Sequence, residues 1–280
     1  MMPLKLDSHQ HFWKYSAAEY GWIDDPTLRR DFLPDNLHKE LRAAKIDGSI
    51  GVQARQTVAE TEWLLALADQ NKFMKGVVGW VPLTSPTVEA DIEKFAARTK
   101  LKGVRHVIQD EKDDRYILRE DFNAGVSLLK DHRLAYDILI FDRHLPYAIQ
   151  FVDGHPKQRF ILDHIAKPRI REGVVLPWRD NLREIAKRPN VWCKISGVVT
   201  EADHQHWTEA QLRFYIDTAI DAFTPKRVMF GSDWPVCLEA TTYKNWSDLM
   251  HRATLQYSLD ERASIFGGAA IEAYRIEEKP

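Results

Sequence analysis

Three histidines and one aspartate stand where short apolar runs of the sequence end. His9 and His11 are separated by one residue at the end of the first run. Side chains two positions apart on a strand point the same way, so both imidazoles can face one ligand. Neutral imidazoles bind divalent transition metals, and they can also polarise a carbonyl group directly. By itself, such a pair is equally compatible with two ordinary hydrogen-bonded side chains.

The other two residues, His164 and Asp233, follow later apolar runs. Adjacent residues on a strand point to opposite faces, so Asp163 and His164 are expected to have different roles, with His164 facing a pocket. A carboxylate at the position of Asp233 can take a proton from water or bind a metal. A histidine or an aspartate that only caps a loop or a helix is the structural alternative.

Eight short apolar runs, several of them rich in Val and Ile, alternate with amphipathic segments. The expected strands cover residues 4–9, 48–54, 74–81, 101–108, 134–140, 159–163, 191–195 and 227–231. Such runs are typical of parallel strands that are covered on both faces. Eight strand–helix units in series predict an α/β protein, a closed (β/α)8 TIM barrel that forms a single domain over residues 1–280. An open, doubly wound sheet is the alternative, although no Gly-rich loop follows the first strand as a dinucleotide site would require.

Helix signals lie between these runs. Thr57-Val58-Ala59-Glu60 has the pattern of a capping box. Apolar residues at helical spacing predict helices over 208–223 and over 260–274, the second of which would close the chain. Pro34, Pro177 and Pro225 are expected to lie at helix starts or in loops, where the missing N–H has little effect.

In a TIM barrel the catalytic side chains gather at the carboxyl ends of the strands. Strands 1, 6 and 8 would therefore bring His9, His11, His164 and Asp233 to one end, with strands 1 and 8 as neighbours. The segment 12–33 after the first strand is long for such a loop and rich in aromatic residues. It is expected either to cover the active site or to pack as an aromatic plug over the barrel mouth.

The charge of the chain excludes two classes of partner. Its 280 residues carry 39 Lys and Arg against 41 Asp and Glu, a formal net charge of −2. This balance, without a long block of like charge, argues against a nucleic-acid or membrane partner. The N-terminus lacks the apolar run of a signal peptide, and Cys193 and Cys237 are expected to be buried or free thiols. We therefore expect a cytoplasmic protein. The sequence leaves open whether it forms a homo-oligomer.

At these residues the chain resembles the amidohydrolase superfamily, and within it a lactonase-like branch. That branch includes lactonases for L-fuconolactone, L-rhamnonolactone and galactonolactone, and the 2-pyrone-4,6-dicarboxylate lactonases. The resemblance covers nearly the whole chain. Its motifs are DSHQHFW at 7–13, VQARQT at 52–57, KGVRH at 102–106, LDHIAKP at 162–168, KISG at 194–197 and GSDWP at 231–235.

The resemblance implies hydrolysis of a sugar-derived aldonolactone to the aldonic acid. Asp233 would be the general base that takes a proton from water and returns it to the departing ring oxygen. His9, His11 and His164 would surround the carbonyl oxygen, either directly or through one divalent ion that all four residues bind, zinc being the first candidate. No organic cofactor is implied. The strand 4 lysine or acid and the strand 5 histidine of two-metal members are missing, so a binuclear site is not expected.

Further residues at strand ends are expected to bind the substrate. A guanidinium such as that of Arg105 can grip a carbonyl, a hydroxyl pair or a carboxylate with two prongs, unless it only forms an ion pair. The remaining expected contacts are Gln53, Arg55, Trp80, Tyr136, Lys194 and Ser196, with core packing as the alternative for Trp80 and Tyr136. Supporting positions behind the site are expected for His106 and Asp137, and solvated loop positions for His204 and His206.

Two other functions remain open. A dicarboxylate lactonase or a metal-dependent decarboxylase would need several arginines in the pocket, but only Arg55 and Arg105 stand at strand ends, with Arg115 and Arg119 in a loop. A barrel that binds sugar without catalysis would not need three histidines and an aspartate. Hydrolysis of a neutral aldonolactone is the preferred hypothesis, and it leaves the sugar, the ring size and the need for a metal undecided.

Overall fold

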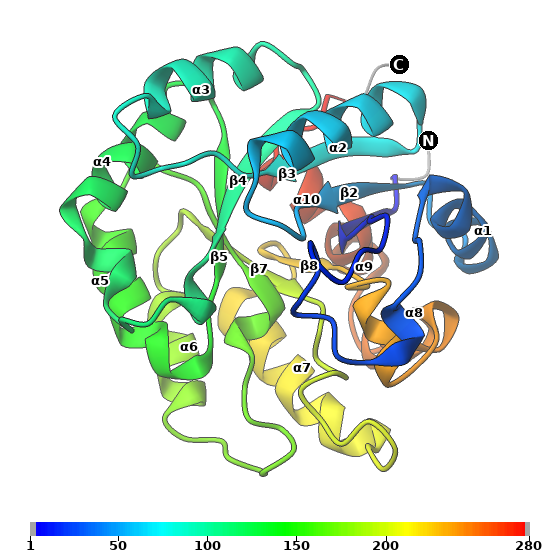
Figure 1. Cartoon of the computed structure of the whole chain (residues 1–280). Helices are drawn as coiled ribbons and strands as arrows, with labels where there is room; N and C mark the ends of the chain where they lie inside the picture. The colour runs from blue at the N-terminus through cyan, green and yellow to red at the C-terminus, as the bar shows by residue number, and fades with distance from the viewer. Residues whose placement is uncertain (1–3, 278–280) are drawn as a thin grey trace.

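The computed structural model describes residues 4–277, and its strands run parallel in the order of the sequence (Figure 1). The strands are β1 (Leu6–Gln10), β2 (Gly48–Val52), β3 (Met74–Gly79), β4 (Leu101–Val107), β5 (Ala135–Leu139), β6 (Phe160–Leu162), β7 (Val191–Ile195) and β8 (Val228–Phe230). Each strand pairs with the next one along the chain. This order confirms the predicted single-domain (β/α)8 barrel and excludes the open doubly wound sheet.

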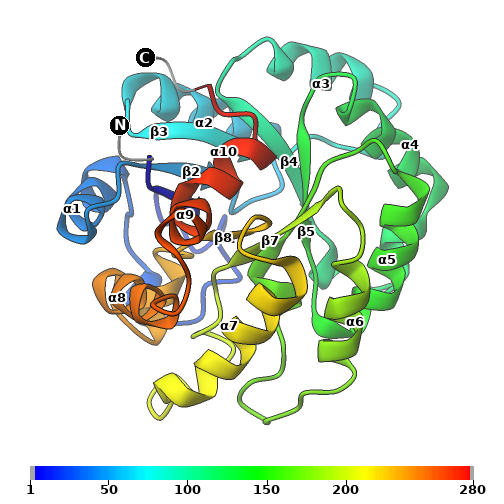
Figure 2. The same ribbon diagram turned by 180° about the vertical axis from the view of Figure 1, so that it is seen from behind.

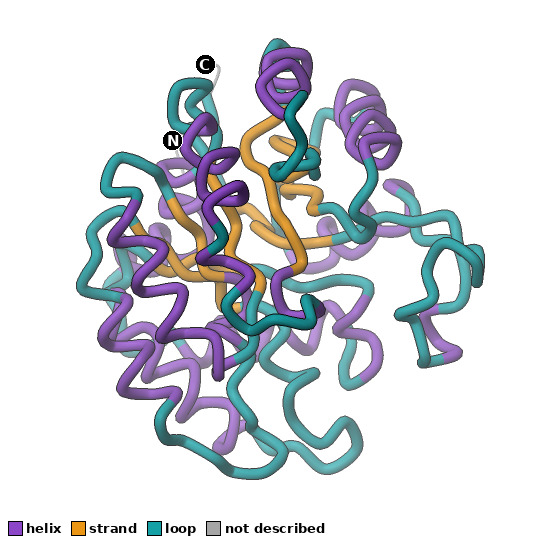
Figure 3. The backbone as a smooth tube through the Cα atoms, turned by 60° about the vertical axis from the view of Figure 1, so that its left-hand side comes forward, coloured by secondary structure: helices purple, strands orange, loops and turns teal. Residues whose placement is uncertain are grey.

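A helix follows each strand and packs outside the barrel (Figure 3). These helices are α1 (Pro34–Ala44), α2 (Val58–Gln70), α3 (Val88–Ala96), α4 (Glu120–Leu129), α5 (Leu145–Gly154), α6 (Trp178–Ile185), α7 (Glu209–Phe223) and α8 (Tyr243–Ala253). Pro34 is the first residue of α1 and Pro177 precedes α6, as predicted. The predicted helix over 208–223 is α7, with Thr208 as its N-cap. Within residues 4–277, no helix has the length and apolar character needed to cross a membrane.

Backbone hydrogen bonds join β1 to the segment after β8 and close the barrel at its carboxyl end. The N–H of Asp233 donates to the carbonyl of His9 at 2.8 Å, and the N–H of His11 donates to the carbonyl of Trp234 at 2.7 Å. Gln10 and Trp234 form the corresponding parallel bridge. Closure therefore fixes the backbones of His9, His11 and Asp233 side by side.

The opposite end of the barrel is filled by the C-terminal segment. The short helix α10 (Ala269–Ala273) lies in front of the strands in Figure 2. Its residues Ala269, Ala270 and Ala273, followed by Tyr274, are buried against strand residues such as Leu6. Small alanines let the helix approach the strands closely, while Tyr274 occupies the interior. Residues 269–276 thus form a plug under the barrel.

The predicted helix over 260–274 is not continuous, which corrects the expectation from the sequence. It consists of α9 (Leu259–Ala263), a wide turn (Ser264–Gly268) and α10. At Gly267 the backbone leaves the helical conformation, and a Cβ there would lie 1.8 Å from the carbonyl oxygen of Leu4. The chain entering β1 therefore takes the space that a regular helix would need.

The predicted capping box at α2 is only half formed. The Thr57 hydroxyl accepts a hydrogen bond from the N–H of Glu60 at 3.2 Å, as predicted. The carboxylate of Glu60, however, accepts from the N–H of Arg55 at 2.5 Å rather than from Thr57. The loop after β2 turns back over the start of α2, so this buried carboxylate serves the loop instead.

The segment between β1 and α1, dark blue in Figure 1, closes on itself. Trp13 and Phe32 exchange backbone hydrogen bonds of 3.0 and 2.9 Å. The rings of Trp13, Tyr20 and Phe32 are buried, and Phe32 lies edge-on to Trp234 with ring centres 5.2 Å apart. These aromatic contacts attach the segment to the residue that follows Asp233.

Candidate active site

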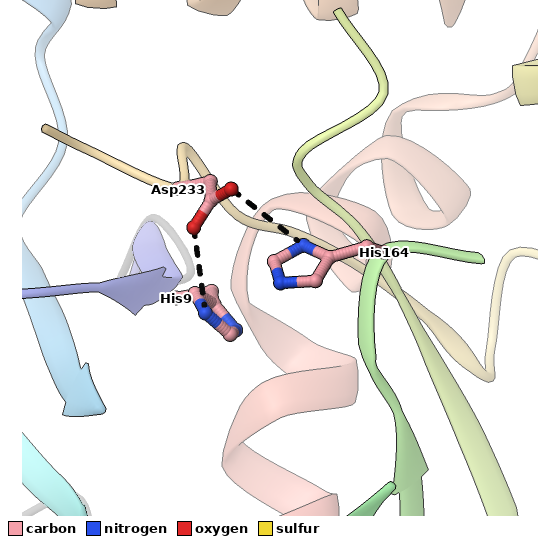
Figure 4. A group of neighbouring side chains, drawn as sticks. All are labelled: His9, His164 and Asp233. Carbon is pink, nitrogen blue, oxygen red and sulfur yellow. Dashed lines mark ion pairs between the residues drawn. The ribbon is translucent and has the colours of Figure 1, made fainter. Parts of the chain in front are cut away.

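The four residues singled out in the sequence meet at the carboxyl end of the barrel. His9 ends β1, His164 lies in the turn after β6 and Asp233 follows β8 (Figure 4). Asp233 Oδ1 lies 3.6 Å from His9 Nε2 and 3.3 Å from His11 Nε2, and its Oδ2 lies 3.9 Å from His164 Nδ1. None of the four is more than 5% exposed. Three imidazoles therefore surround one buried carboxylate.

Unusual backbone conformations aim two of these side chains. His164 has a φ of 52° and Asp233 a φ of 57°, both in the left-handed region. Such conformations cost residues other than glycine roughly 1–3 kcal/mol and persist where the surrounding structure imposes them. Here the fold directs the side chains of His164 and Asp233 towards each other across the strand ends.

A glycine gives the pair the room it needs. Gly197, directly after β7, has a φ of 61°, which favours glycine. A Cβ at this position would lie 2.6 Å from His164 Nδ1 and 3.0 Å from Asp233 Oδ2. Any larger residue would push these two side chains aside.

Burial sets the protonation states in the group. It lowers the pKa of His164 to about 4 and holds the pKa of His9 well below its ordinary value, the latter with help from the charge of Lys194. Burial alone would raise the pKa of Asp233, but its interactions with His164, His11 and His9 outweigh this and keep its pKa below the ordinary value. Near neutral pH the site thus holds an ionised carboxylate beside neutral His9 and His164.

A buried network of charges lies behind His9. Lys194 Nζ is 2.5 Å from Asp137 Oδ2, 3.0 Å from Asp163 Oδ1 and 3.1 Å from His9 Nδ1. Arg105 Nη1 donates to Asp163 Oδ2 at 3.0 Å. Burial would raise the pKa of Asp163, but Lys194, His9 and Arg105 hold it well below its ordinary value. Two buried cations are therefore balanced by two buried carboxylates, as charges in a protein interior must be.

Sequence reasoning underestimated this network. Lys194 was expected to reach the sugar, yet it is fully buried and engaged with Asp137 and Asp163. Tyr274, which the sequence reasoning did not single out, donates its hydroxyl to Asp137 Oδ2 at 2.6 Å. The available signal was a lysine and an aspartate inside strands that are otherwise apolar, because buried charges need partners of opposite sign.

Three of the expected substrate residues border the central group. Arg105 Nη2 donates to the carbonyl of Gln53 at 2.5 Å, and Gln53 Nε2 donates to the carbonyl of Arg105 at 3.3 Å. The hydroxyl of Ser196 lies 2.9 Å from His164 Nδ1. Arg105 also reaches the central group, with Nη1 3.4 Å from His9 Nε2.

The other expected contacts lie away from the central group. The Arg55 guanidinium pairs with Glu19 of the segment after β1 and lies over the ring of Tyr20. Trp80 Nε1 donates to His106 Nδ1 at 3.3 Å, and His106 in turn pairs with Glu111.

Tyr136 is fully buried against Phe122, Phe151 and Phe160, the packing role that was the alternative for it. Of the two loop histidines, His206 is exposed beside Asp203, whereas His204 lines a polar pocket.

This pocket lies beside the turn that carries His164. It has a volume of about 320 Å³ and is lined by polar residues including Lys167, Thr200, Glu201 and His204. Lys167 Nζ lies 3.9 Å from Glu201 Oε1. Burial raises the pKa of Glu201, with the charge of Asp233 adding to the effect and that of Lys167 opposing it. Glu201 is therefore within electrostatic reach of Asp233.

The central group also has the donor atoms for a metal ion. One ligand atom from each of His9, His164 and Asp233 lies within 4.8 Å of the others. Two imidazoles and one carboxylate are a ligand set that zinc accepts in catalytic sites, where a further position stays open. The residues present thus fit a single divalent ion.

Comparisons with known proteins agree with this arrangement. A family model described as amidohydrolase matches residues 6–276. The chain is 42% identical over 291 residues to an L-fucono-1,5-lactonase of Burkholderia multivorans, covering 99% of this chain and 98% of that protein. It is 34% identical over 282 residues to an L-fucono-1,5-lactonase of Burkholderia ambifaria, covering 99% of this chain and 97% of that one.

A solved structure has the same fold throughout. It is an amidohydrolase from Burkholderia multivorans with bound zinc, which superposes with a TM-score of 0.94 at 41% identity and covers 98% of this chain and 100% of that chain. The match extends over the whole barrel, including the strand ends that carry the site. The chain therefore belongs to the amidohydrolase family.

Proposed function

We propose that this protein hydrolyses a sugar-derived aldonolactone, of the L-fucono-, L-rhamnono- or galactonolactone type, to the aldonic acid. The observation that carries the proposal is the buried carboxylate of Asp233 surrounded by His9, His11 and His164. The two relatives named L-fucono-1,5-lactonase support a lactone substrate, and L-fucono-1,5-lactone is the first one to test.

In the proposed reaction Asp233 acts as general base. It takes a proton from a water molecule while the water oxygen bonds to the lactone carbonyl carbon, and the carbonyl electron pair moves onto its oxygen. His9, His11 and His164, with Arg105 beside His9, stabilise the resulting oxyanion. The tetrahedral intermediate collapses by breaking the bond to the ring oxygen, which takes the proton back from Asp233. The product acid then ionises and releases one proton.

The polar pocket beside His164 supports a hydroxylated substrate. Its volume of about 320 Å³ has room for a six-carbon sugar ring, and Lys167, Thr200 and Glu201 offer hydrogen-bond donors and acceptors. Lys167 lies near Glu201, and Arg169 lies near Asp142. The pocket is also lined by Arg143, Arg171 and Glu172, so cations and carboxylates are mixed in it. This mixture suits the hydroxyl groups of a neutral polyol lactone, and the three arginines keep a dicarboxylate lactone as the second candidate.

We further propose that His9, His11, His164 and Asp233 can hold one divalent ion, zinc first, as the zinc in the related Burkholderia multivorans structure supports. When bound, such an ion polarises a carbonyl and acidifies water. Only small-molecule partners and a cytoplasmic location are proposed, in keeping with the balanced charge.

The test is lactone hydrolysis, followed as proton release in weak buffer. L-fucono-, L-rhamnono- and galactonolactones should be compared for the wild type and for Asp233→Asn. We expect turnover of at least one lactone and a loss of about a thousandfold or more in Asp233→Asn. Asp248→Asn, an exposed change on α8, is the control.

A folded protein that hydrolyses none of these lactones would contradict the proposal. Turnover of 2-pyrone-4,6-dicarboxylate instead would identify the dicarboxylate lactonase alternative. Sugar binding without turnover, measured by calorimetry, would identify a barrel that only binds.

A further inference from the structure

Lys194 has three hydrogen-bond acceptors around its amino group. They are Asp137 Oδ2 at 2.5 Å, Asp163 Oδ1 at 3.0 Å and His9 Nδ1 at 3.1 Å. Lys194, Asp137 and Asp163 are fully buried, as is His9. The ammonium group donates hydrogen bonds to Asp137 Oδ2 and His9 Nδ1, whereas its contact with Asp163 Oδ1 is an ion pair. Asp163 Oδ1 also lies 3.4 Å from His9 Nδ1, farther than Lys194 Nζ does. The ring nitrogen Nδ1 of His9 then acts as an acceptor and cannot carry a proton in the neutral ring.

The surroundings of the other ring nitrogen agree with this assignment. His11 Nδ1 lies 2.9 Å from the carbonyl oxygen of Val52, which can only accept, so His11 carries a proton on Nδ1. His11 Nε2 lies 3.1 Å from His9 Nε2 and 3.3 Å from Asp233 Oδ1. Asp233 Oδ1 lies 3.6 Å from the same nitrogen of His9.

One donor also approaches His9 Nε2, namely Arg105 Nη1 at 3.4 Å. Arg105 Nη1 lies closer to Asp163 Oδ2, at 3.0 Å, and donates a hydrogen bond to that oxygen. The ammonium group of Lys194 is thus the charged group closest to His9, and it lies at Nδ1, while the carboxylate of Asp233 lies on the Nε2 side. This is the pattern of a ring protonated on Nε2.

We propose that Lys194 is the positioning residue of this site and keeps the proton of neutral His9 on Nε2, the nitrogen that faces Asp233. In this tautomer His9 presents an N–H to the centre of the site, where an oxyanion would form. The catalytic meaning of the inference rests on the proposed function, whereas the tautomer itself can be measured without any substrate.

The plug at the opposite end of the barrel holds Lys194 in place. Tyr274, which follows α10, donates to Asp137 Oδ2 at 2.6 Å, the same oxygen that accepts from Lys194. The ring of Tyr274 also lies under the ammonium group, with Nζ 5.4 Å from the ring centre. The C-terminal segment is therefore connected to His9 through Tyr274, Asp137 and Lys194, and we assign it a part in positioning the site.

The first experiment needs no substitution in the network. Metal-free protein labelled with ¹⁵N-histidine is examined by long-range ¹H–¹⁵N correlation NMR, and the His9 signals are identified by their loss in His9→Gln. We expect the pattern of a neutral ring protonated on Nε2 near pH 7.5. A ring protonated on Nδ1, or on both nitrogens, would overturn the proposal even if lactones are hydrolysed.

The second experiment tests the network with Lys194→Met and Tyr274→Phe. Lys194→Met removes the donor, so the His9 tautomer should change and kcat should fall by roughly a hundredfold while KM stays within about twofold. This variant leaves two buried carboxylates without their cation and can fail to fold. Tyr274→Phe is the milder change, for which we expect a roughly three- to tenfold lower kcat, an unchanged KM and shifted His9 signals.

The control is Thr254→Val. It removes the hydrogen bond of another buried hydroxyl, which donates to the carbonyl of Met250 at 2.9 Å at the end of α8, and should leave the His9 signals in place. If Tyr274→Phe retains wild-type kcat and His9 signals, the proposed role of the C-terminal segment is wrong. A protein without lactonase activity but with the Nε2 tautomer would contradict the proposed function and leave this assignment standing.

Discussion

Asp7 accepts two hydrogen bonds from Ser232, one from the backbone N–H at 2.8 Å and one from the hydroxyl at 2.6 Å. The two residues lie on opposite sides of the seam between β1 and β8. They come two positions before His9 and one position before Asp233, respectively. A carboxylate with two acceptor oxygens can accept from both donors. It thereby holds together the two segments that carry His9 and Asp233.

We predict that Asp7→Asn destabilises the fold and lowers activity. The amide places an NH2 group against the donors of Ser232, so a buried donor loses its acceptor. The free energy of unfolding should fall by roughly 2–3 kcal/mol. Urea unfolding measures this change, with Asp248→Asn as an exposed control expected to lie within about 1 kcal/mol of the wild type. Equal stability of Asp7→Asn and Asp248→Asn would contradict the proposed role of the hydrogen bonds between Asp7 and Ser232.

Gly197→Ala should damage catalysis more than folding. The new Cβ would meet His164 Nδ1 at 2.6 Å and displace it from Asp233, so we expect kcat to fall about a hundredfold. Gly173→Ala is the matched control because its φ of 66° is similar but nothing lies within 4 Å of a Cβ there. It should lose only about 1 kcal/mol of stability and keep its activity. Equal kcat values for the two variants would show that the contact with His164 is unimportant.

His164 should make the stability depend on pH. Burial lowers its pKa from 6.5 to about 4, so between these values the unfolded chain binds a proton that the folded protein does not. The stabilisation is fully present above pH 6.5 and is lost as the pH falls towards 4, by at most roughly 3 kcal/mol. Urea unfolding measures the free energy of unfolding at pH 7.5 and at pH 4.5. The decrease of this free energy between the two pH values should be about 2 kcal/mol smaller in His164→Gln than in the wild type. Parallel losses in both proteins would argue against a buried neutral His164.

Removal of metal should leave the reaction largely intact. A proton on His9 Nε2 competes with a metal ion for that nitrogen, and an ester carbonyl is activated enough for hydrogen-bond donors to open it. We expect the initial rate to stay within about twofold after dialysis against a chelator, with the metal content checked by emission spectroscopy. A rate that vanishes and returns with added zinc would show that the ion is required.

The sequence was sufficient to predict the barrel and the strand-end positions of His9, His11, His164 and Asp233. Apolar runs at regular intervals predict parallel strands, and polar residues directly after them, such as His9 and Asp233, are conspicuous because they interrupt the pattern. The bounds of β6 and β8 were less certain, since those strands are only three residues long. The break at Gly267 could not be predicted, because it depends on the carbonyl of Leu4, which lies far away in the sequence.

Only the tertiary structure decided which polar residues meet at the strand ends and which pair with one another inside the barrel. Lys194 and Arg105 are both cations near strand ends, and their sequence neighbours do not reveal that Asp137 and Asp163 balance them inside the barrel. Nor does the sequence connect Tyr274, in the last turn of the chain, with a carboxylate on β5. The local pattern determines where a side chain stands along a strand, but hydrogen bonds and ion pairs depend on distances between strands. Those distances are set when the barrel closes.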